Sequence, residues 1–231
     1  MKKTILLILG LCFVAGIILA ESSSQDKIYW GSEAVPDKWN GSWPEAFLTV
    51  PEKTNFEKTA SHYEILEYLT ALKWNCEYMH DFNMFTSDLR RNCPVVVMAN
   101  PRITTPEEAR ASGKTVVYLQ GGIHPGECEG KEALLMLMRD ILMGEKKYLL
   151  NKLIIICCPH FNVDGTQTWE ITDSLPKING TRHNAEGFDV NRDAIKLETT
   201  NMRGACENLL NTWDPTIMLD THRMSGARHG Y

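Results

Sequence analysis

The sequence predicts an α/β fold in which a mixed, mostly parallel sheet carries helices on both of its faces. Four short apolar runs with strand character alternate with segments of helical periodicity. Histidine, carboxylate or amide side chains follow three of these runs directly, where the carboxyl ends of parallel strands would gather a site. We divide the chain into a signal segment at 1–20, a polar leader at 21–43 and a single domain at 44–231.

The first half of the domain is predicted to form one helix and two strands. Ser61 and Glu64 match a capping box at the start of a helix over residues 61–74. The apolar stripe of that helix consists of Ile65, Leu66, Leu69 and Leu72. Residues 94–100 and 115–120 are short apolar runs, expected to be buried strands. The polar segment between them, 104–114, is expected to be a surface excursion.

The second half continues the alternation after a glycine turn. Gly121 and Gly122 end the second strand and allow a sharp turn, and Pro125 disfavours helix at His124, so this stretch is expected to be a loop. The helix that follows has an apolar face made of Leu134, Leu135, Met138, Ile141 and Leu142. The remaining elements are expected at 152–159 (strand), 199–213 (helix) and 216–220 (strand).

The first twenty residues are predicted to be an export signal. Lys2 and Lys3 give a basic start, and residues 5–20 are apolar and uncharged. Cleavage after Ala20 would make the protein extracellular or periplasmic. The runner-up is a signal anchor that stays uncleaved, although the segment is just short of a comfortable membrane span.

The composition excludes several classes of partner. The formal net charge is −5, and loss of Lys2 and Lys3 with the signal would make it −7. This balance argues against nucleic acid as a partner, and against stable membrane contact unless the signal is retained. The cysteines are interpreted as small buried hydrophobic side chains, although an exported protein could pair some of them. Cys157 and Cys158 are adjacent strand residues that point to opposite faces, and no spacing matches a cysteine zinc site.

Three residues that are far apart in sequence carry the candidate chemistry. His124 and Glu127 lie in the loop after the second strand, and His222 follows the last strand. Two neutral imidazoles and a carboxylate supply the three protein ligands of a catalytic Zn²⁺ and leave one position for water. Each residue alone is weak evidence, because solvated loop pairs and structural histidines are commoner. Together with the motifs between them, they predict one zinc ion bound by all three.

Two motifs lie between these ligands, "PHFNVDG" at 159–165 and "GFDVNRD" at 187–193. With "YLQGGIHPGECEGKEALL" before them and "MLDTH" after them, the chain from about Thr59 onward resembles the zinc metallocarboxypeptidases, the carboxypeptidase A-like peptidases. The resemblance implies a zinc carboxypeptidase-like fold with one Zn²⁺ ion. It implies hydrolysis of C-terminal peptide bonds by a metal-activated water. The substrate would be a peptide with a free C-terminal carboxylate.

The resemblance also implies roles for four further residues. Asn191 and Arg192 would bind the terminal carboxylate of the substrate, which a planar guanidinium matches with a fork of donors. Asp189 would accept a hydrogen bond from a ligand imidazole, expected to be His124, and so fix its tautomer. Arg182 would be catalytic by stabilising the oxyanion, with a solvated loop arginine as the alternative.

Other residues near the motifs are expected to lie outside the ligand set. Asn162 and Asp164 are interpreted as turn formers that shape the site. His160 and His183 are interpreted as non-ligands, since three ligands are already assigned. An ordinary surface pair is the alternative for Asp189 and Arg192.

One part of the family's machinery has no counterpart in this sequence. The family's general base is a glutamate on a strand downstream of the third ligand, but the last glutamate here is Glu207, before His222. We therefore expect the sheet to lack its C-terminal portion and to leave an edge uncovered. One explanation is an incomplete copy of a longer enzyme. The other is a shortened zinc-binding protein without hydrolytic power, because general-base help is typically worth about 10²- to 10⁴-fold in rate.

Three functions follow from these alternatives. The leading hypothesis is an exported zinc exopeptidase that removes C-terminal residues from peptides. The second is a related zinc amidohydrolase that acts on N-acyl amino acids, against which the "NVDG" and "DVNRD" motifs argue. The third is a non-catalytic fragment that binds zinc or peptide.

Overall fold

The computed structural model describes residues 43–167 and 180–223. The predicted signal segment and almost all of the predicted leader lie outside the described residues. Within the described ranges, no helix combines the length and the apolar character needed to cross a bilayer.

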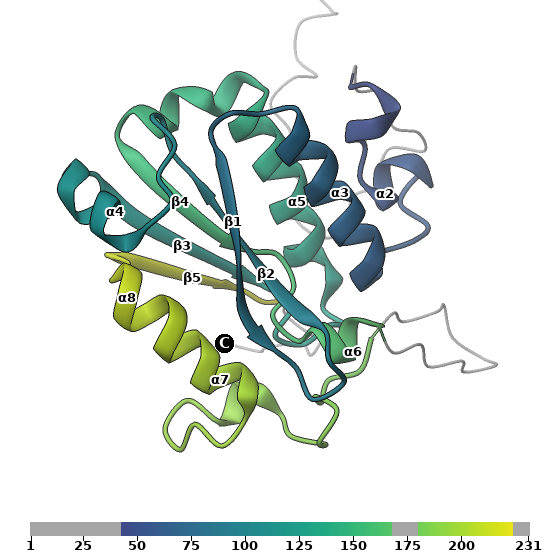
Figure 1. Ribbon diagram of the computed structural model, residues 1–231. Helices are drawn as coiled ribbons and strands as arrows, with labels where there is room; N and C mark the ends of the chain where they lie inside the picture. Colours follow the sequence, from purple (N-terminus) through teal and green to yellow (C-terminus); the bar gives the residue numbers. More distant parts are fainter. Residues whose placement is uncertain (1–42, 168–179, 224–231) are drawn as a thin grey trace, which may run out of the picture. The chain divides into compact units, whose positions relative to one another are not determined.

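A five-stranded sheet forms the centre of the described structure, with the strand order β1-β2-β4-β3-β5 (Figure 1). The strands are β1 Met79–Thr86, β2 Asn92–Met98, β3 Thr115–Gly121, β4 Leu153–Cys158 and β5 Ile217–Thr221. β3 pairs in parallel with β4 and β5, whereas β2 pairs antiparallel with β1 and β4. Four of these strands therefore run in one direction, which confirms the predicted mixed, mostly parallel sheet.

Helices of very different length connect these strands. The α-helices are α2 Val50–Lys53, α3 His62–Trp74, α4 Pro106–Ser112, α5 Cys128–Leu142, α6 Val163–Gln167, α7 Thr200–Ala205 and α8 Asn211–Trp213. Short 3₁₀ turns lie at Glu45–Phe47, Glu145–Asn151 and Val190–Arg192, and a π-helical segment at Cys206–Leu210 joins α7 to α8.

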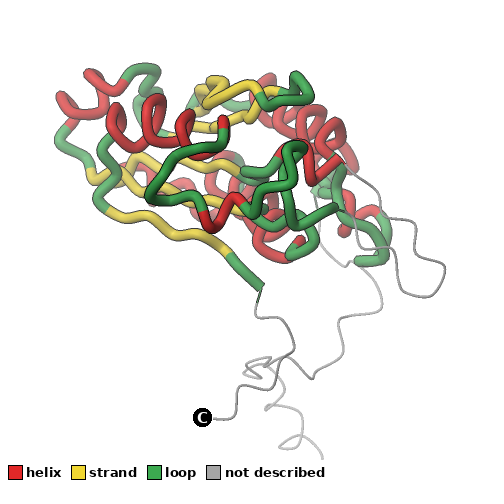
Figure 2. The backbone as a smooth tube through the Cα atoms, turned by 90° about the horizontal axis from the view of Figure 1, so that it is seen from below, coloured by secondary structure: helices red, strands yellow, loops and turns green. Residues whose placement is uncertain are grey.

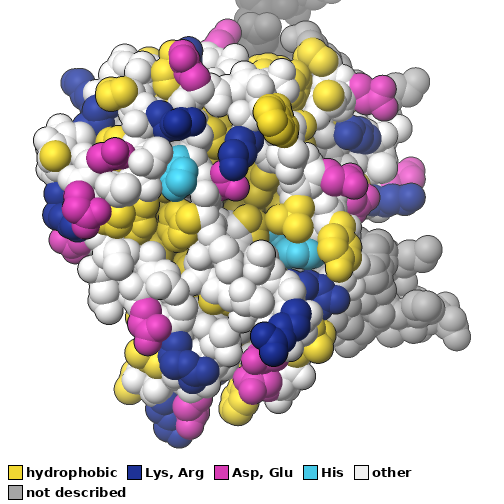
Figure 3. Space-filling view, viewed as in Figure 1, with side chains coloured by type: hydrophobic (Ala, Val, Ile, Leu, Met, Phe, Trp, Pro, Cys, Tyr) yellow, Lys and Arg dark blue, Asp and Glu magenta, His cyan; other side chains and the backbone are white. Residues whose placement is uncertain are grey.

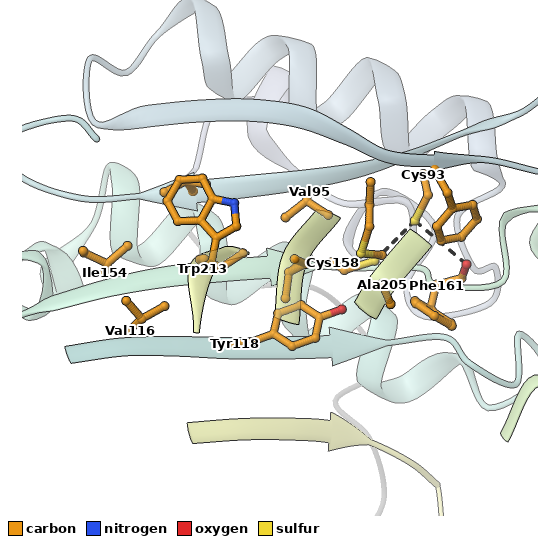
Figure 4. Close-up of a cluster of buried hydrophobic side chains, with 14 of the residues drawn as sticks. Cys93, Val95, Val116, Tyr118, Ile154, Cys158, Phe161, Ala205 and Trp213 are labelled. Carbon is orange, nitrogen blue, oxygen red and sulfur yellow. Dashed lines mark hydrogen bonds between the residues drawn. The ribbon is translucent and has the colours of Figure 1, made fainter. Parts of the chain in front are cut away.

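Alternating residues of β2 divide the hydrophobic core into two clusters, one on each face of the sheet. Val95 and Val97 belong to the cluster that contains Trp213 of α8 (Figure 4). Val96 and Met98 belong to the cluster formed with α3 and α5. Helices therefore cover both faces, as predicted, and each fully buried aliphatic side chain contributes roughly 1.5–3 kcal/mol.

The cysteines of the sheet follow the same alternation. Cys157 lies in the cluster beneath α3 and α5, and Cys158 lies in the opposite cluster. The Sγ atom of Cys158 is 3.6 Å from that of Cys93, and both are free thiols in the buried core (Figure 4). This confirms the prediction that the adjacent pair points to opposite faces.

The two long helices begin and pack as their sequences predict. Glu64 Oε2 accepts from the Ser61 N–H at 2.8 Å, which closes the capping box of α3. All five residues predicted for the apolar face of α5 are buried. α5 begins directly after the loop that follows β3, and that loop carries the candidate site.

Three local features differ from the prediction. β1 is not predicted because "MHDFNMFT" mixes polar and apolar residues and only part of the edge strand is buried. The surface excursion at 104–114 contains the short helix α4, which a Thr105–Glu108 capping box begins and Gly113 ends with φ +67°. The single helix expected at 199–213 is divided by the π-helical segment.

Candidate metal centre

Two glycines shape the loop that follows β3. A Cβ atom on Gly121 would lie 2.7 Å from the Pro159 carbonyl oxygen, and Gly122 has φ +65°, which favours glycine. The carbonyl oxygens of Gly121 and Gly122 accept hydrogen bonds from the backbone N–H groups of Phe161 and Asn162 at 2.8 and 3.1 Å. The ends of β3 and β4 are thereby joined, so the loop is fixed at the carboxyl edge of the sheet.

The first two predicted ligands lie in this loop. The Glu127 N–H donates to the His124 carbonyl oxygen at 2.9 Å, and Glu127 is the residue immediately before α5. The turn brings His124 Nδ1 and Glu127 Oε1 to within 3.0 Å of each other. His124 is buried, whereas Glu127 is partly exposed.

β5 brings the third predicted ligand to the same place. Thr221, at its end, lies beside Gly121 of β3, and its hydroxyl donates to the Gln120 carbonyl oxygen at 2.8 Å. A Cβ atom on Gly130 would lie only 2.2 Å from the Thr221 hydroxyl oxygen, so the first turn of α5 packs directly on β5. His222 follows Thr221 and is about one third exposed.

Glu127 lies between the two imidazoles. Its Oε1 atom is 3.0 Å from His124 Nδ1, and its Oε2 atom is 3.0 Å from His222 Nδ1. The imidazole centroids are 5.2 Å apart, and one ligand atom from each of the three residues lies within 4.8 Å of the other two. In the described parts of the chain, no other group of three His, Cys, Asp or Glu residues is arranged to hold a metal ion.

A carboxylate contacts the far nitrogen of each imidazole. Asp189 Oδ1 is 3.0 Å from His124 Nε2, and Asp220 Oδ2 is 2.9 Å from His222 Nε2. The first contact is the one the sequence predicts for Asp189. Asp220 is missed by the sequence reasoning, although its position two residues before His222 in a strand indicates a shared face.

Hydrogen bonding keeps the central carboxylate ionised. Partial burial alone would raise the pKa of Glu127, but hydrogen bonds from His222, the Arg223 N–H and His124 together lower it. Burial alone would lower the pKa of His222, but its contacts with Glu127 and Asp220 raise it. Glu127 is therefore the anionic member of the cluster that the three predicted ligands form.

Arg182 lies at the border of this cluster. Its Nε and Nη2 atoms are both 2.9 Å from Asp189 Oδ2. Its Nη1 atom is 3.4 Å from His124 Nδ1 and 3.8 Å from Glu127 Oε1, and the side chain is 45% exposed. Arg182 is thus paired with Asp189 and is not a solvated loop arginine. Its guanidinium is close enough to the cluster to contact a molecule bound there.

Asn191 and Arg192 follow Asp189 in a 3₁₀ turn. The Asn191 N–H donates to Asp189 Oδ1 at 3.1 Å, the same oxygen that contacts His124. The exposed Arg192 guanidinium donates to the Asn191 carbonyl oxygen at 2.9 Å. Their backbone is therefore tied to the site.

The remaining motif residues lie away from the ligands. Asn162 Oδ1 accepts from the Gly165 N–H at 2.9 Å, which is a turn-forming contact. Asp164 instead pairs with Arg91 at 2.8 Å and accepts from the Ser87 hydroxyl, so it anchors the turn between β1 and β2. His160 is fully buried and has His62 as its hydrogen-bond partner.

One face of the molecule is mixed in charge. Figure 3 shows basic and acidic side chains interspersed over one face of the molecule, without a large area of a single sign. Seen from below, β5 runs along the outer border of the described residues (Figure 2). Ile217, Met218 and Leu219 of this strand are each about half exposed.

Comparison with protein families gives one match. The family model described as zinc carboxypeptidase matches residues 96–212. This segment contains His124, Glu127 and the Asp189–Arg192 motif, and it ends before His222.

Curated relatives are similar over more than half of this chain. Carboxypeptidase 2 of Trichophyton tonsurans is 31% identical over 146 residues, which are 62% of this chain and 24% of the relative. Carboxypeptidase 2 of Trichophyton rubrum is 30% identical over 146 residues, with the same two shares. The match thus spans about a quarter of the length of these relatives.

Solved structures share the fold at lower identity. Carboxypeptidase A from Helicoverpa armigera has a TM-score of 0.56 and 17% identity, covering 74% of this chain and 47% of its own. A metallo-carboxypeptidase from Burkholderia cenocepacia has a TM-score of 0.55 and 16% identity, covering 72% and 42%. At this identity the likeness concerns the fold alone.

Proposed function

Because the chain belongs to the zinc carboxypeptidase family, we propose that it holds one Zn²⁺ between His124, Glu127 and His222 and hydrolyses C-terminal peptide bonds. The observation that carries this proposal is the position of Glu127. Each of its two carboxylate oxygens lies 3.0 Å from the Nδ1 atom of a different imidazole. Two imidazoles and one carboxylate match the donor set of a catalytic zinc.

The chain's own residues fit the requirements of such an ion. When bound, Zn²⁺ would polarise the scissile carbonyl and lower the pKa of a water molecule beside it. His124 and His222 would present Nδ1 as the neutral ligand atoms, and Glu127 would supply the negative charge. Because His124 is buried and His222 is partly exposed, substrate would enter on the His222 side.

Three residues beside the cluster would bind the peptide. Arg182 can donate hydrogen bonds to the carbonyl oxygen as negative charge develops on it, while Asp189 holds its guanidinium in place. Asn191 and Arg192 would bind the terminal carboxylate of the substrate, because an exposed guanidinium next to the site offers paired donors. The preferred ligand is therefore a peptide with a free C-terminus.

A second candidate is a zinc-binding protein without hydrolytic activity. Among the described residues, Glu127, Asp189 and Asp220 each contact an imidazole of the cluster. All three of these carboxylates are thus engaged with the imidazoles of the cluster. This observation favours metal binding, which the imidazole–carboxylate contacts support whether or not a peptide is hydrolysed.

Zinc content is the first test. We expect one Zn²⁺ per chain in the purified protein, and its loss on His124→Ala, Glu127→Ala or His222→Ala. His183→Ala is the matched control, because this exposed histidine lies near Arg182 in sequence but is not one of the three ligands. Full zinc retention by any one of the three ligand variants would refute this ligand set.

Substrate preference is the second test, and it separates the candidate functions. A carboxypeptidase releases the terminal amino acid from an N-blocked dipeptide faster than it cleaves an N-acyl amino acid. The reverse preference would indicate the amidohydrolase. Stoichiometric zinc with no hydrolysis of either substrate would favour the binding protein.

We also propose that the protein is exported. The support is the basic start at Lys2 and Lys3 and the uncharged apolar run at 5–20. N-terminal sequencing of the protein recovered from the cell exterior or periplasm is expected to begin at Glu21. A start at Met1 would instead indicate a retained anchor.

A further inference from the structure

Asp220 occupies a position that mirrors that of Asp189 on the other side of the cluster. It lies in β5, two residues before His222, so both side chains project from the same face of the extended segment. Asp220 Oδ2 is 2.9 Å from His222 Nε2. Asp189 Oδ1 is 3.0 Å from His124 Nε2, although Asp189 comes from a 3₁₀ turn and not from a strand. Two unrelated segments thus place a carboxylate behind each imidazole.

The two carboxylates face the same nitrogen of each ring. In both histidines Nε2 meets an aspartate, and Nδ1 meets Glu127 at 3.0 Å. When a metal ion takes up the Glu127 carboxylate, the aspartate at Nε2 would be the acceptor that keeps the ring proton there and leaves the Nδ1 lone pair to the ion. The orientation of both rings therefore depends on their aspartate partners.

The two aspartates differ in how their second oxygen is used. Asp189 Oδ2 is bound by Arg182, whereas Asp220 Oδ1 is buried and has no hydrogen-bond partner among the described residues. Among the described residues, the Asp220 carboxylate therefore has His222 as its hydrogen-bond partner. His222 is also more exposed than His124, at 34% against 5% of its side chain, so it has fewer packing contacts to hold its ring.

From this geometry we propose that Asp220 is a positioning residue that holds His222 in the Nε2-protonated tautomer and aims its Nδ1 atom at the metal ion. The inference rests on the zinc site proposed above and adds a residue to it. Asp220 does not touch the metal or the substrate. It acts on the third ligand, the one supplied by β5 and the one not included in the family match.

The test is zinc affinity of the full 231-residue chain, measured by competition with a chelating dye. We expect Asp220→Asn to weaken zinc binding about 10- to 100-fold, because an amide that donates to Nε2 would move the ring proton to Nδ1. Asp189→Asn should weaken it to a similar degree through His124. Asp214→Asn is the control, an exposed aspartate that precedes β5 and lies outside the cluster.

The outcomes separate this inference from the proposed site. If His222→Ala still binds zinc as the wild type does, the proposed site itself is wrong. If His222→Ala loses zinc but Asp220→Asn binds it with unchanged affinity, only the role of Asp220 is refuted. Asp220→Glu can reach the same nitrogen with a carboxylate and should recover part of the affinity.

If the variants do not fold, the tautomer of His222 can be measured in the wild-type protein. In the zinc-loaded protein, ¹⁵N-detected spectra of the imidazoles report which nitrogen carries the proton. We expect His222 to carry it on Nε2, with a downfield, slowly exchanging N–H signal that marks a carboxylate acceptor. A proton on Nδ1 of His222 would overturn the inference.

Discussion

Two pairs of histidines in this molecule have almost the same ring separation and opposite surroundings. The centroids of His124 and His222 are 5.2 Å apart, and those of His62 and His160 are 5.1 Å apart. In the first pair, three carboxylates contact the four ring nitrogens. In the second pair, His62 Nδ1 and His160 Nε2 bond directly to each other at 2.8 Å. We call these the site pair and the core pair.

The difference shows that proximity of imidazoles does not by itself make a metal site. Burial lowers the pKa of His62 to about 4 and lowers that of His160 well below its usual value, so the core pair is neutral. Its shared hydrogen bond uses the nitrogen atoms that a metal ion would need. In the site pair, each Nε2 atom faces an aspartate oxygen, and both Nδ1 atoms face Glu127 and not each other.

The largest loss of zinc affinity at the site pair should come from changing a residue that belongs to neither pair. Gly130→Ala would place a Cβ atom 2.2 Å from the Thr221 hydroxyl oxygen and 2.8 Å from its carbonyl oxygen. The clash would push the end of β5 away from α5 and separate His222 from Glu127. We expect zinc affinity to fall more than 100-fold, together with roughly 1–3 kcal/mol of stability.

A matched glycine controls for the loss of stability. Gly113→Ala meets no atom within 4 Å, but it is strained by a φ of +67°, far from the site at the end of α4. It should lower the melting temperature and leave zinc affinity unchanged. Normal zinc binding by Gly130→Ala would mean that the position of His222 does not depend on the close packing of α5 against β5.

The sequence predicts the site pair because each of its members follows a strand of a mostly parallel sheet. Such strand ends meet at one edge, so His124 and His222 could be expected together despite their separation along the chain. Asp220 is not predicted, because an aspartate next to a histidine in a strand has no motif of its own. The proposed role of Asp220 depends on which ring nitrogen of His222 faces it. The orientation of that ring depends in turn on the contact between His222 Nδ1 and Glu127, which lies on another segment.

The core pair could not be predicted for a different reason. His62 begins α3 and His160 follows β4, and neither has a polar motif partner in the sequence. Their contact is set by how α3 packs on the sheet. β1 is missed for a related reason, because an edge strand with polar positions lacks the apolar run that identifies the buried strands.

The second prediction concerns the response of the core pair to acid. The folded-state pKa of His62 is about 4, below its usual value of 6.5, because of burial and the nearby Arg91, which Asp164 partly offsets. As pH falls, the unfolded chain therefore binds a proton before the folded chain does. The contribution of His62 to stability is complete above about pH 6.5 and is lost as pH falls towards 4. Between pH 7.5 and 5 we expect a loss of about 2 kcal/mol from this residue.

Urea unfolding of variants at the two pH values checks this prediction. His62→Asn keeps a polar group near the Nδ1 position and does not titrate, so its stability should depend less on pH than that of the wild type. His183→Asn, at an exposed histidine, should keep the wild-type dependence. Equal pH dependence of His62→Asn and the wild type would contradict the assignment of the core pair as neutral. Zinc content should not change in either variant, since neither residue is a proposed ligand.

A smaller effect on zinc affinity than that of Gly130→Ala is expected from Arg182, the cation next to the site pair. The Nη1 atom of Arg182 lies 3.4 Å from His124 Nδ1 and 3.8 Å from Glu127 Oε1, so its positive charge opposes a divalent cation at those atoms. Arg182→Ala should therefore bind zinc a few-fold more tightly, although Asp189 loses its guanidinium partner. Turnover, where it is measurable, should fall about 10²- to 10³-fold, because the proposed donor to the oxyanion is removed. Arg192→Ala is the control for zinc affinity and should leave it unchanged. Weaker zinc binding by Arg182→Ala would instead show that Arg182 acts mainly by orienting Asp189 behind His124.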